Sequence, residues 1–511
     1  MSIFGSHSRP QWSSNFVYIL AAVGCAAGLG NLWRFSMLAY EHGGAAFILA
    51  LLISNVVVVF PLVMMETVVG QKFQMGGPSA FEKIKKGTNW IQWIPVFTLM
   101  VLLAYYLPIL AWGIKYLVLS LSGAFLENPG EYFTSEVIHL TDNIQNIGTF
   151  QWGLLAGVLA GYGLVLYALR KNVMSLGPVV KITATAPFVL LLILIVRGVT
   201  LPGAMDGLEA LFIPKWAAML DIKLWQAAVS QSFFSASLAM GYFIIAGSHR
   251  SEKSEVAKTS LWLLGGNFLV SILCGLAVFS TLGYMALQQG VPVSEAATGG
   301  PMLVFTVLPT AVSLMPWGMI FFAVLLFLVV VTLAIDSIFG IIEVIAGAFH
   351  DLYHKIKYSR LILIISVLLI LGSLPYLTGA GLYFLDITDH FIGGYMFLLV
   401  GLLETLVLAY VIGADEIRSW INHTNKGFKI GKWFNIMLYI IPLLCAFLLS
   451  VTLYKETQEV YGGYPFSYIV WWGFIPLGLV LALSILFGVI THRKMKRQGL
   501  LGSLVDKING N

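Results

Sequence analysis

The sequence predicts an all-α polytopic membrane protein, and three observations carry this prediction. Of its 511 residues, 59% are hydrophobic and only 10% are charged, whereas a soluble domain carries about 25% charged residues. Apolar segments recur at the ~20 residues needed to cross a ~30 Å hydrocarbon core. Lys and Arg are distributed unevenly between alternate loops. An isolated strand would leave its backbone unsatisfied in lipid, so the spanning segments are expected to be helices.

Twelve apolar segments follow one another along the chain. They lie at 14–37, 44–70, 90–122, 150–170, 176–198, 224–247, 258–288, 317–349, 360–376, 390–413, 433–454 and 466–491. A further apolar run at 302–314 is too short to span the bilayer. We expect it to form a re-entrant or lid element on the outer side.

The loop charges predict the orientation of these segments. With a cytoplasmic N-terminus, 23 of the 29 Lys and Arg residues fall on the inner side. The other six are Arg34, Lys115, Arg197, Lys215, Lys223 and Lys455. This asymmetry follows the positive-inside rule, so we expect a multi-pass plasma-membrane protein with both termini in the cytoplasm and with lipid around it. The net charge of +5 is small and indicates no nucleic-acid partner.

The first apolar segment carries residues that weaken a membrane helix. Gly24, Gly28, Gly30 and Asn31 lie in its middle and Arg34 follows. A helix break there would free backbone N–H groups and carbonyls, which an anion and a cation could satisfy. A small-residue packing face, Gly24-xxx-Gly28, is the alternative.

Other apolar segments also contain polar residues, which at such depth indicate function by default. Segment six holds Gln231, Ser235 and Ser237, although such hydroxyls can also bond back to their own helix. The remaining polar positions are Asp336 and Ser337 in segment eight, Asn267 and Ser271 in segment seven, and Glu66 in segment two.

The run AAVGCAAGLGNLWRFSMLAYEHGGAAF at 21–47 resembles the first-helix signature of the neurotransmitter:sodium symporter family, the LeuT-like transporters. The resemblance covers roughly residues 9–415. It implies two inverted five-helix repeats, 14–198 and 224–413, with helices one and six broken. The remaining divisions are a cytoplasmic segment 1–13, an extracellular connection 199–223, helices eleven and twelve at 414–491, and a cytoplasmic tail 492–511.

The resemblance implies two sodium sites and a substrate pocket. The first sodium site would use Ala26, Asn31, Ser235 and Asn267 together with the substrate carboxylate. The second would use Gly24, Ala27, Leu333, Asp336 and Ser337. The substrate carboxylate would meet the N–H groups of Leu29 and Gly30 and the hydroxyl of Tyr106. The pocket lining would comprise Cys25, Ala26, Gly28, Leu102, Tyr106, Phe234, Ser235, Ser237, Met240, Ser337 and Ile341.

The resemblance also implies gates and a candidate anion site. Arg34 would pair with Asp389 above the pocket, and Arg9 with Asp351 below it, where Trp12 packs. Gln231, Ser235, Asn267 and Ser271 match the chloride-binding pattern of the family. Leu51, however, replaces the tyrosine of that site, which favours a transporter that does not strictly require chloride.

Gly28 is informative about the substrate. Monoamine carriers of this family have an aspartate there, whereas glycine leaves room for the carboxylate of an amino acid. The apolar lining favours a neutral, hydrophobic one, but Ala239 in place of a glycine and Met240 in place of a phenylalanine leave its size open.

The predicted function is therefore sodium-coupled import of such amino acids by alternating access. Another small zwitterion or osmolyte as substrate, and a non-transporting scaffold of the same fold, remain the alternatives. An enzyme is not expected, because His350 and His354 lack the glutamate of a zinc-protease motif. The sequence leaves the oligomeric state open.

Overall fold

A computed structural model describes residues 9–169, 173–296 and 300–499 of the chain. These residues are almost entirely helical and contain no β-strand, only an isolated bridge between Phe150 and Thr378. The predicted all-α class is therefore confirmed. Of the basic residues used to predict orientation, Arg170, Lys171 and Lys507 lie outside the described residues, as does most of the predicted tail.

Ten helical stretches among the described residues are long and apolar enough to cross a membrane. Five of them are single or paired helices in the first two thirds of the chain: α4 (Ala45–Ser54) with α5 (Phe60–Phe73), α7 (Asn89–Ser122), α9 (Trp152–Leu169), α10 (Val173–Thr183) with α11 (Ala186–Val199), and α15 (Val256–Gln289). The others are α19 (Met319–Leu352), α20 (Tyr358–Ser373), the stretch α21 (Gly381–Phe391), α22 (Phe397–Leu406) and α23 (Ala414–Thr424), α24 (Trp433–Gln458), and α25 (Phe466–Ile469) with α26 (Ile475–Arg497).

Short 3₁₀ and π turns interrupt or join these helices. The π turns are Asn55–Val59, Phe133–Val137, Leu303–Val307, Ile392–Met396, Val407–Gly413 and Val470–Phe474. The 3₁₀ turns are Ala124–Leu126, Trp216–Leu220, Leu374–Leu377 and Tyr461–Gly463.

Two of the expected segments are broken. The first consists of α1 (Asn15–Ala26), α2 (Leu29–Leu32) and α3 (Arg34–Glu41), with a bend of 65° after α1. It adds an eleventh span if the bent pair is counted as one. The segment at 224–247 comprises α13 (Ile222–Ser235) and α14 (Tyr242–Ser248), each too short to span alone. The predicted count of twelve therefore depends on taking this pair as one broken span.

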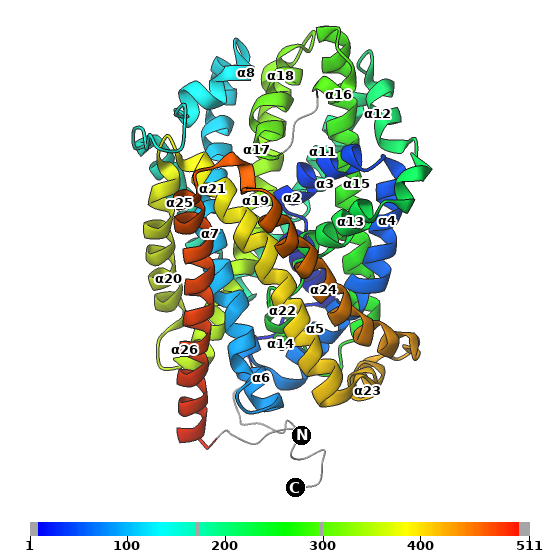
Figure 1. Cartoon of the computed structure of the whole chain (residues 1–511), viewed down its shortest axis with the longest axis vertical. Coiled ribbons are helices and arrows are strands. Elements are labelled where there is room, and N and C mark those ends of the chain that lie inside the picture. Colours follow the sequence, from blue (N-terminus) through cyan, green and yellow to red (C-terminus); the bar gives the residue numbers. More distant parts are fainter. Residues whose placement is uncertain (1–8, 170–172, 297–299, 500–511) are drawn as a thin grey trace.

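Short connecting helices gather at opposite ends of the molecule (Figure 1). One end, at the top of the view, holds α8 (Pro129–Tyr132), α12 (Ala204–Phe212), α16 (Val293–Ala296) and α18 (Leu308–Ser313). The other end holds α6 (Gly77–Ile84), α23 and the last turns of α26. The apolar run expected at 302–314 forms a short helical segment, Gly300–Ser313, that packs on α15 and α19. Its length is below that of a span, as predicted.

The broken helices lie among long helices at the centre of the bundle. α1 packs against α10, α15 and α19, α14 packs against α5, and α19 also packs against α7 and α11. Outer helices such as α24 and α26 expose large apolar side chains, among them Leu443 and Leu479. The interior is mainly apolar, and it encloses the few polar residues that the sequence places in apolar segments.

Candidate functional site

The break after α1 lies against α19, and its glycines permit the close approach. A Cβ at Gly24 would lie 2.9 Å from Oδ2 of Asp336, and one at Gly28 would lie 2.7 Å from Oγ of Ser337. The N–H of Gly28 bonds to the carbonyl of Ala26 at 2.9 Å, so the regular α-helical pattern ends there. Backbone carbonyls of the first helix thus meet the polar residues of α19.

Asp336 is a buried carboxylate with an open coordination shell. Its residue is 4% exposed, and neither carboxylate oxygen has a hydrogen-bond partner among the described residues. The nearby Thr183 hydroxyl bonds to the carbonyl of Val179. A buried charge without a partner is costly, and buried carboxylates are normally paired or coordinate a cation. Asp336 therefore fits a monovalent cation.

The rest of the predicted second sodium site surrounds Asp336. The Ser337 hydroxyl lies 3.2 Å from the carbonyl of Cys25 and 3.4 Å from that of Leu333. Ala27 is the C-cap residue of α1 and follows Gly24, another predicted ligand, along the same helix. The residues predicted for this site thus come from the end of α1 and one turn of α19.

A second polar cluster joins α2, α13 and α15. Nδ2 of Asn31 donates to Oδ1 of Asn267 at 3.0 Å and to Oγ of Ser271 at 2.9 Å. Ser235 accepts from Nδ2 of Asn267 at 2.9 Å and lies 3.4 Å from Oδ1 of Asn31. Nε2 of Gln231 reaches the carbonyl of Gly30 at 3.4 Å. The structure therefore brings together the side chains predicted for the first sodium site and for chloride.

This cluster is electrically neutral. Its amide and hydroxyl oxygens suit sodium, and its N–H and O–H donors suit an anion. Among the described residues, none of its hydrogen bonds reaches a carboxylate. A sodium ion held here would gain from a negative charge supplied by an anion or a substrate.

The predicted substrate pocket adjoins both clusters. A Cβ at Gly28 would lie 3.7 Å from the Tyr106 hydroxyl, which also lies close to the N–H of Leu29. A Cβ at Gly30 would lie 2.5 Å from the Phe234 ring, so a side chain there would displace that ring. Cys25 lies against Gly340 and close to Ser237. Three more predicted lining residues are buried nearby on α7, on α19 and in the break of segment six: Leu102, Ile341 and Met240.

The break in segment six contains left-handed backbone at residues other than glycine. Ser237 has φ +53° and Ala239 has φ +56°, a conformation that costs about 1–3 kcal/mol for such residues. The N–H of Ala239 donates to Oε1 of Glu66 at 3.0 Å. Glu66 lies beside Glu404, which accepts from Nε2 of Gln92 at 2.9 Å. A buried carboxyl pair therefore supports the strained segment.

The gate predicted around Arg9 is closed. Arg9 forms an ion pair with Asp351, and its guanidinium also donates to Oγ of Ser248 at 2.8 Å. The N–H of Gly76 donates to Oδ2 of Asp351 at 2.6 Å. Nε1 of Trp12 donates to the carbonyl of Ala246 at 3.0 Å. These contacts tie the N-terminal segment, α14, α19 and the start of α6 together.

His249 adds to this closed end. Its Nδ1 lies 2.7 Å from the carbonyl oxygen of Pro10, and its Nε2 lies 3.4 Å from Oε1 of Glu343. Tyr358 donates its hydroxyl to the other oxygen of Glu343. A cavity of about 10 Å³ lies between Glu343, Trp12 and Asp336, which is about the space of one water.

The opposite gate is not paired directly. Arg34 donates to Oγ of Ser230 at 2.9 Å, and its guanidinium lies 5.0 Å from the Phe234 ring centroid. Asp389 instead accepts from the hydroxyl of Tyr105 at 2.7 Å. Among the described residues, Arg34 and Asp389 form no ion pair within 4.0 Å. The predicted partners therefore occupy separate sites in this state of the protein.

Sequence reasoning missed several residues that the site uses. Glu343 lies two helical turns after Asp336 on α19, so helical periodicity alone would have placed a second carboxylate on the same face of this helix. Glu404 is a buried acid in an apolar segment, which is a functional signal by itself. The sequence did not single out Tyr105 or Ser230 as functional residues, because a tyrosine or a serine is common in membrane helices.

Comparisons with known proteins agree with this geometry. Residues 9–127 and 125–498 match the sodium:neurotransmitter symporter family. An uncharacterized sodium-dependent transporter of Methanocaldococcus jannaschii is 32% identical over 481 residues, covering 93% of this chain and 97% of the relative. The sodium- and chloride-dependent GABA transporter 2 of Rattus norvegicus is 31% identical, over 99% of this chain and 89% of the relative. The human GABA transporter 2 is 32% identical, over 94% of this chain and 85% of the relative.

Proposed function

Because the chain belongs to the sodium:neurotransmitter symporter family, we propose that it imports neutral, hydrophobic amino acids, each together with two sodium ions. The protein is a sodium-dependent membrane symporter and not an enzyme. The proposal concerns its substrate, its sodium stoichiometry and the direction of transport.

The observation that carries the sodium proposal is the unpartnered carboxylate of Asp336 beside the broken first helix. A sodium ion would supply the missing positive charge there. Gly24, Ala27, Leu333 and Ser337 would contribute further oxygens. A second sodium ion would use the amide and hydroxyl oxygens of the neutral cluster around Asn31, where the substrate carboxylate would balance its charge.

Gly28 supports the substrate proposal. Its missing side chain faces the hydroxyls of Ser337 and Tyr106. An aspartate at this position would occupy that space and place a negative charge in it, whereas a substrate carboxylate can use both hydroxyls as donors. The surrounding side chains, including Leu102, Met240 and Ile341, favour an apolar substrate side chain.

Two sodium ions would supply a substantial driving force. Each charge moved across the membrane gains about 2.3 kcal/mol per 100 mV, so two gain about 4.6 kcal/mol. At about 1.4 kcal/mol per tenfold, the voltage alone would sustain a substrate gradient of roughly three decades.

A second candidate substrate class is favoured by the relatives named as GABA transporters. A zwitterion with separated charges also presents a carboxylate to Gly28, but it lacks an apolar side chain. It would place its ammonium farther along the pocket, towards the break in segment six. The same names motivate a chloride test, since the cluster around Ser271 holds no carboxylate.

The experiment is binding of a panel of amino acids, GABA included, to purified protein in sodium and in potassium, with chloride and with gluconate. Sodium-dependent binding of one or a few neutral α-amino acids is expected. Selective binding of GABA would replace the first substrate class by the second. No sodium-dependent binding of any zwitterion would contradict the proposal and leave a non-transporting scaffold.

A further inference from the structure

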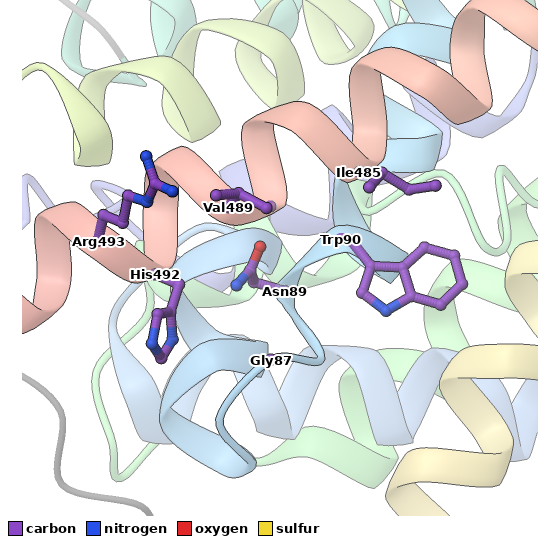
Figure 2. A pocket seen from close by; sticks show the side chains of 8 residues that line it. Gly87, Asn89, Trp90, Ile485, Val489, His492 and Arg493 are labelled. Atoms are coloured by element: carbon purple, nitrogen blue, oxygen red, sulfur yellow. The ribbon is translucent and has the colours of Figure 1, made fainter.

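A groove lies on the surface of the helical bundle, between α26 and the turn that precedes α7 (Figure 2). Its volume is about 410 Å³. Trp90, Ile485 and Val489 form its apolar part, and His492 and Arg493 form a polar end. It lies at the end of the molecule that holds α6. None of the residues of the proposed transport site lines it.

The groove has fixed walls. A Cβ at Gly488 would lie 2.8 Å from Cβ of Trp90, so this glycine lets α26 approach α7 closely. The buried Glu82 holds the facing turn, because it accepts from the N–H of Gly87 at 3.0 Å and from the side chain of Asn89. Glu82 also lies 2.6 Å from Nδ1 of His492 and so fixes the imidazole at the groove.

The polar end carries positive charge that the protein does not neutralise. Arg493 is exposed and forms no hydrogen bond or ion pair within the part of the chain that the structure describes. Lys496, Arg497 and the exposed Lys85 lie on the neighbouring helix end and turn but do not line the groove, so the charge at the groove itself is that of Arg493. Glu82, the acid beside the groove, is buried and already has three partners. An anion is therefore the complementary ligand.

The apolar part continues onto a lipid-facing surface. On α26, Ile485 is 57% exposed and Val489 is 43% exposed, and the next residue on this face is Arg493. A change from exposed apolar to exposed basic residues within one helical turn is typical of the boundary between hydrocarbon and headgroups. Trp90 is an aromatic residue of the kind enriched at that level.

Asn89 is a polar residue in the lining of the groove. Its side chain lies between α26 and the turn (Figure 2). The residue is 1% exposed, and its Oδ1 has no hydrogen-bond partner among the described residues. The Oδ1 atom lies 3.0 Å from the position of a Cβ at Gly488, so it is part of the contact between α26 and the turn and is not open to the groove.

We propose that this groove binds one anionic glycerophospholipid. The phosphate lies against the guanidinium of Arg493 and against Nε2 of His492. An acyl chain follows Trp90, Val489 and Ile485. The lipid thereby bridges α26 to the start of α7 and stabilises their contact.

The test is native mass spectrometry of the full-length protein titrated with phosphatidylglycerol and, separately, with phosphatidylcholine of the same acyl chains. One tightly retained phosphatidylglycerol is expected. Arg493→Gln should weaken its binding about fivefold, as removal of one basic group at an anionic surface predicts. Lys496→Gln is the matched control, because it removes the same charge one turn away and outside the groove, and it should leave binding within twofold.

Further arms separate the other occupants. Val489→Trp fills the apolar part and should abolish retention even with Arg493 intact. Equal loss in the Arg493 and Lys496 variants would reduce the site to diffuse surface charge and overturn the proposal. If the protein retained inorganic phosphate at the groove in the absence of lipid, the groove would be an anion site that does not require a lipid. Phosphatidylglycerol binding only in a chain shortened at Gln498 would assign the groove to the C-terminal segment.

Discussion

Replacing Asp336 by asparagine removes one charge from a site that offers no substitute. The carboxylate is buried and unpartnered, so sodium is the charge it would balance. Two unit charges about 4 Å apart interact by about 4 kcal/mol at an effective dielectric constant of about 20. At about 1.4 kcal/mol per tenfold, the sodium affinity of Asp336→Asn should fall by roughly three decades.

The same substitution should stabilise the protein when sodium is absent. An unpaired buried charge is costly, and a carboxamide removes that cost. In potassium, Asp336→Asn should therefore melt at a higher temperature than the unmodified protein. A ligand present at about 100 times its dissociation constant stabilises by about 2.7 kcal/mol. The unmodified protein should show a stabilisation of this kind in sodium, and the variant should not.

The assay is thermal unfolding of purified protein over a series of sodium concentrations at constant ionic strength. Glu343→Gln provides the control, because it removes another buried carboxylate from α19 whose oxygens already have partners in His249 and Tyr358. Its sodium response should stay within threefold of the unmodified protein. A sodium response of Asp336→Asn that also stayed within threefold would refute the cation site at this carboxylate.

Three other changes test the remaining parts of the site. Ala239→Gly relieves backbone at φ +56° and should stabilise the protein by about 1 kcal/mol in a thermal melt; a lower melting temperature would mean that the methyl group is needed for packing. Gly28→Asp should abolish sodium-dependent binding of zwitterions in a radioligand assay while the protein stays folded, because the new carboxylate fills and charges the space for the substrate; retained binding would remove Gly28 from the pocket. Arg9→Gln breaks the ion pair with Asp351 and should raise the alkylation rate of the buried Cys25 roughly tenfold, as the loss of about 1.4 kcal/mol of closure predicts; an unchanged rate would show that the other contacts suffice to close this end.

The sequence predicted the broken first helix because the signal is local. Gly24, Gly28 and Gly30 remove side chains where α19 and Phe234 approach, and the polar Asn31 follows them. Ser36 shows another local effect, because its hydroxyl donates to the carbonyl of Leu32 one helical turn earlier at 2.8 Å.

The missed contacts depend on tertiary structure. The pairing of Glu66 with Glu404 joins residues on α5 and α22, and a single sequence does not show which two acids meet. Ala239 gave only a substitution pattern, whereas its positive φ and its bond to Glu66 follow from packing. The separate partners of Arg34 and Asp389 likewise come from elements distant in the sequence.

The two predicted gates differ in a way that bears on the proposed alternating access. At the Arg9 end, one ion pair and several hydrogen bonds cross between elements that must separate. At the other end, Arg34 and Asp389 are held by Ser230 and Tyr105 on their own sides of the path. Closing that end would need an exchange of partners, in which two hydrogen bonds between a charged group and a neutral hydroxyl give way to an ion pair. Asp389 is exposed in this structure, and the attraction between the two charges would strengthen if closure excluded water around them. We therefore expect substrate and sodium to favour closure by excluding water from the space beneath Phe234, without any contact of their own with Asp389.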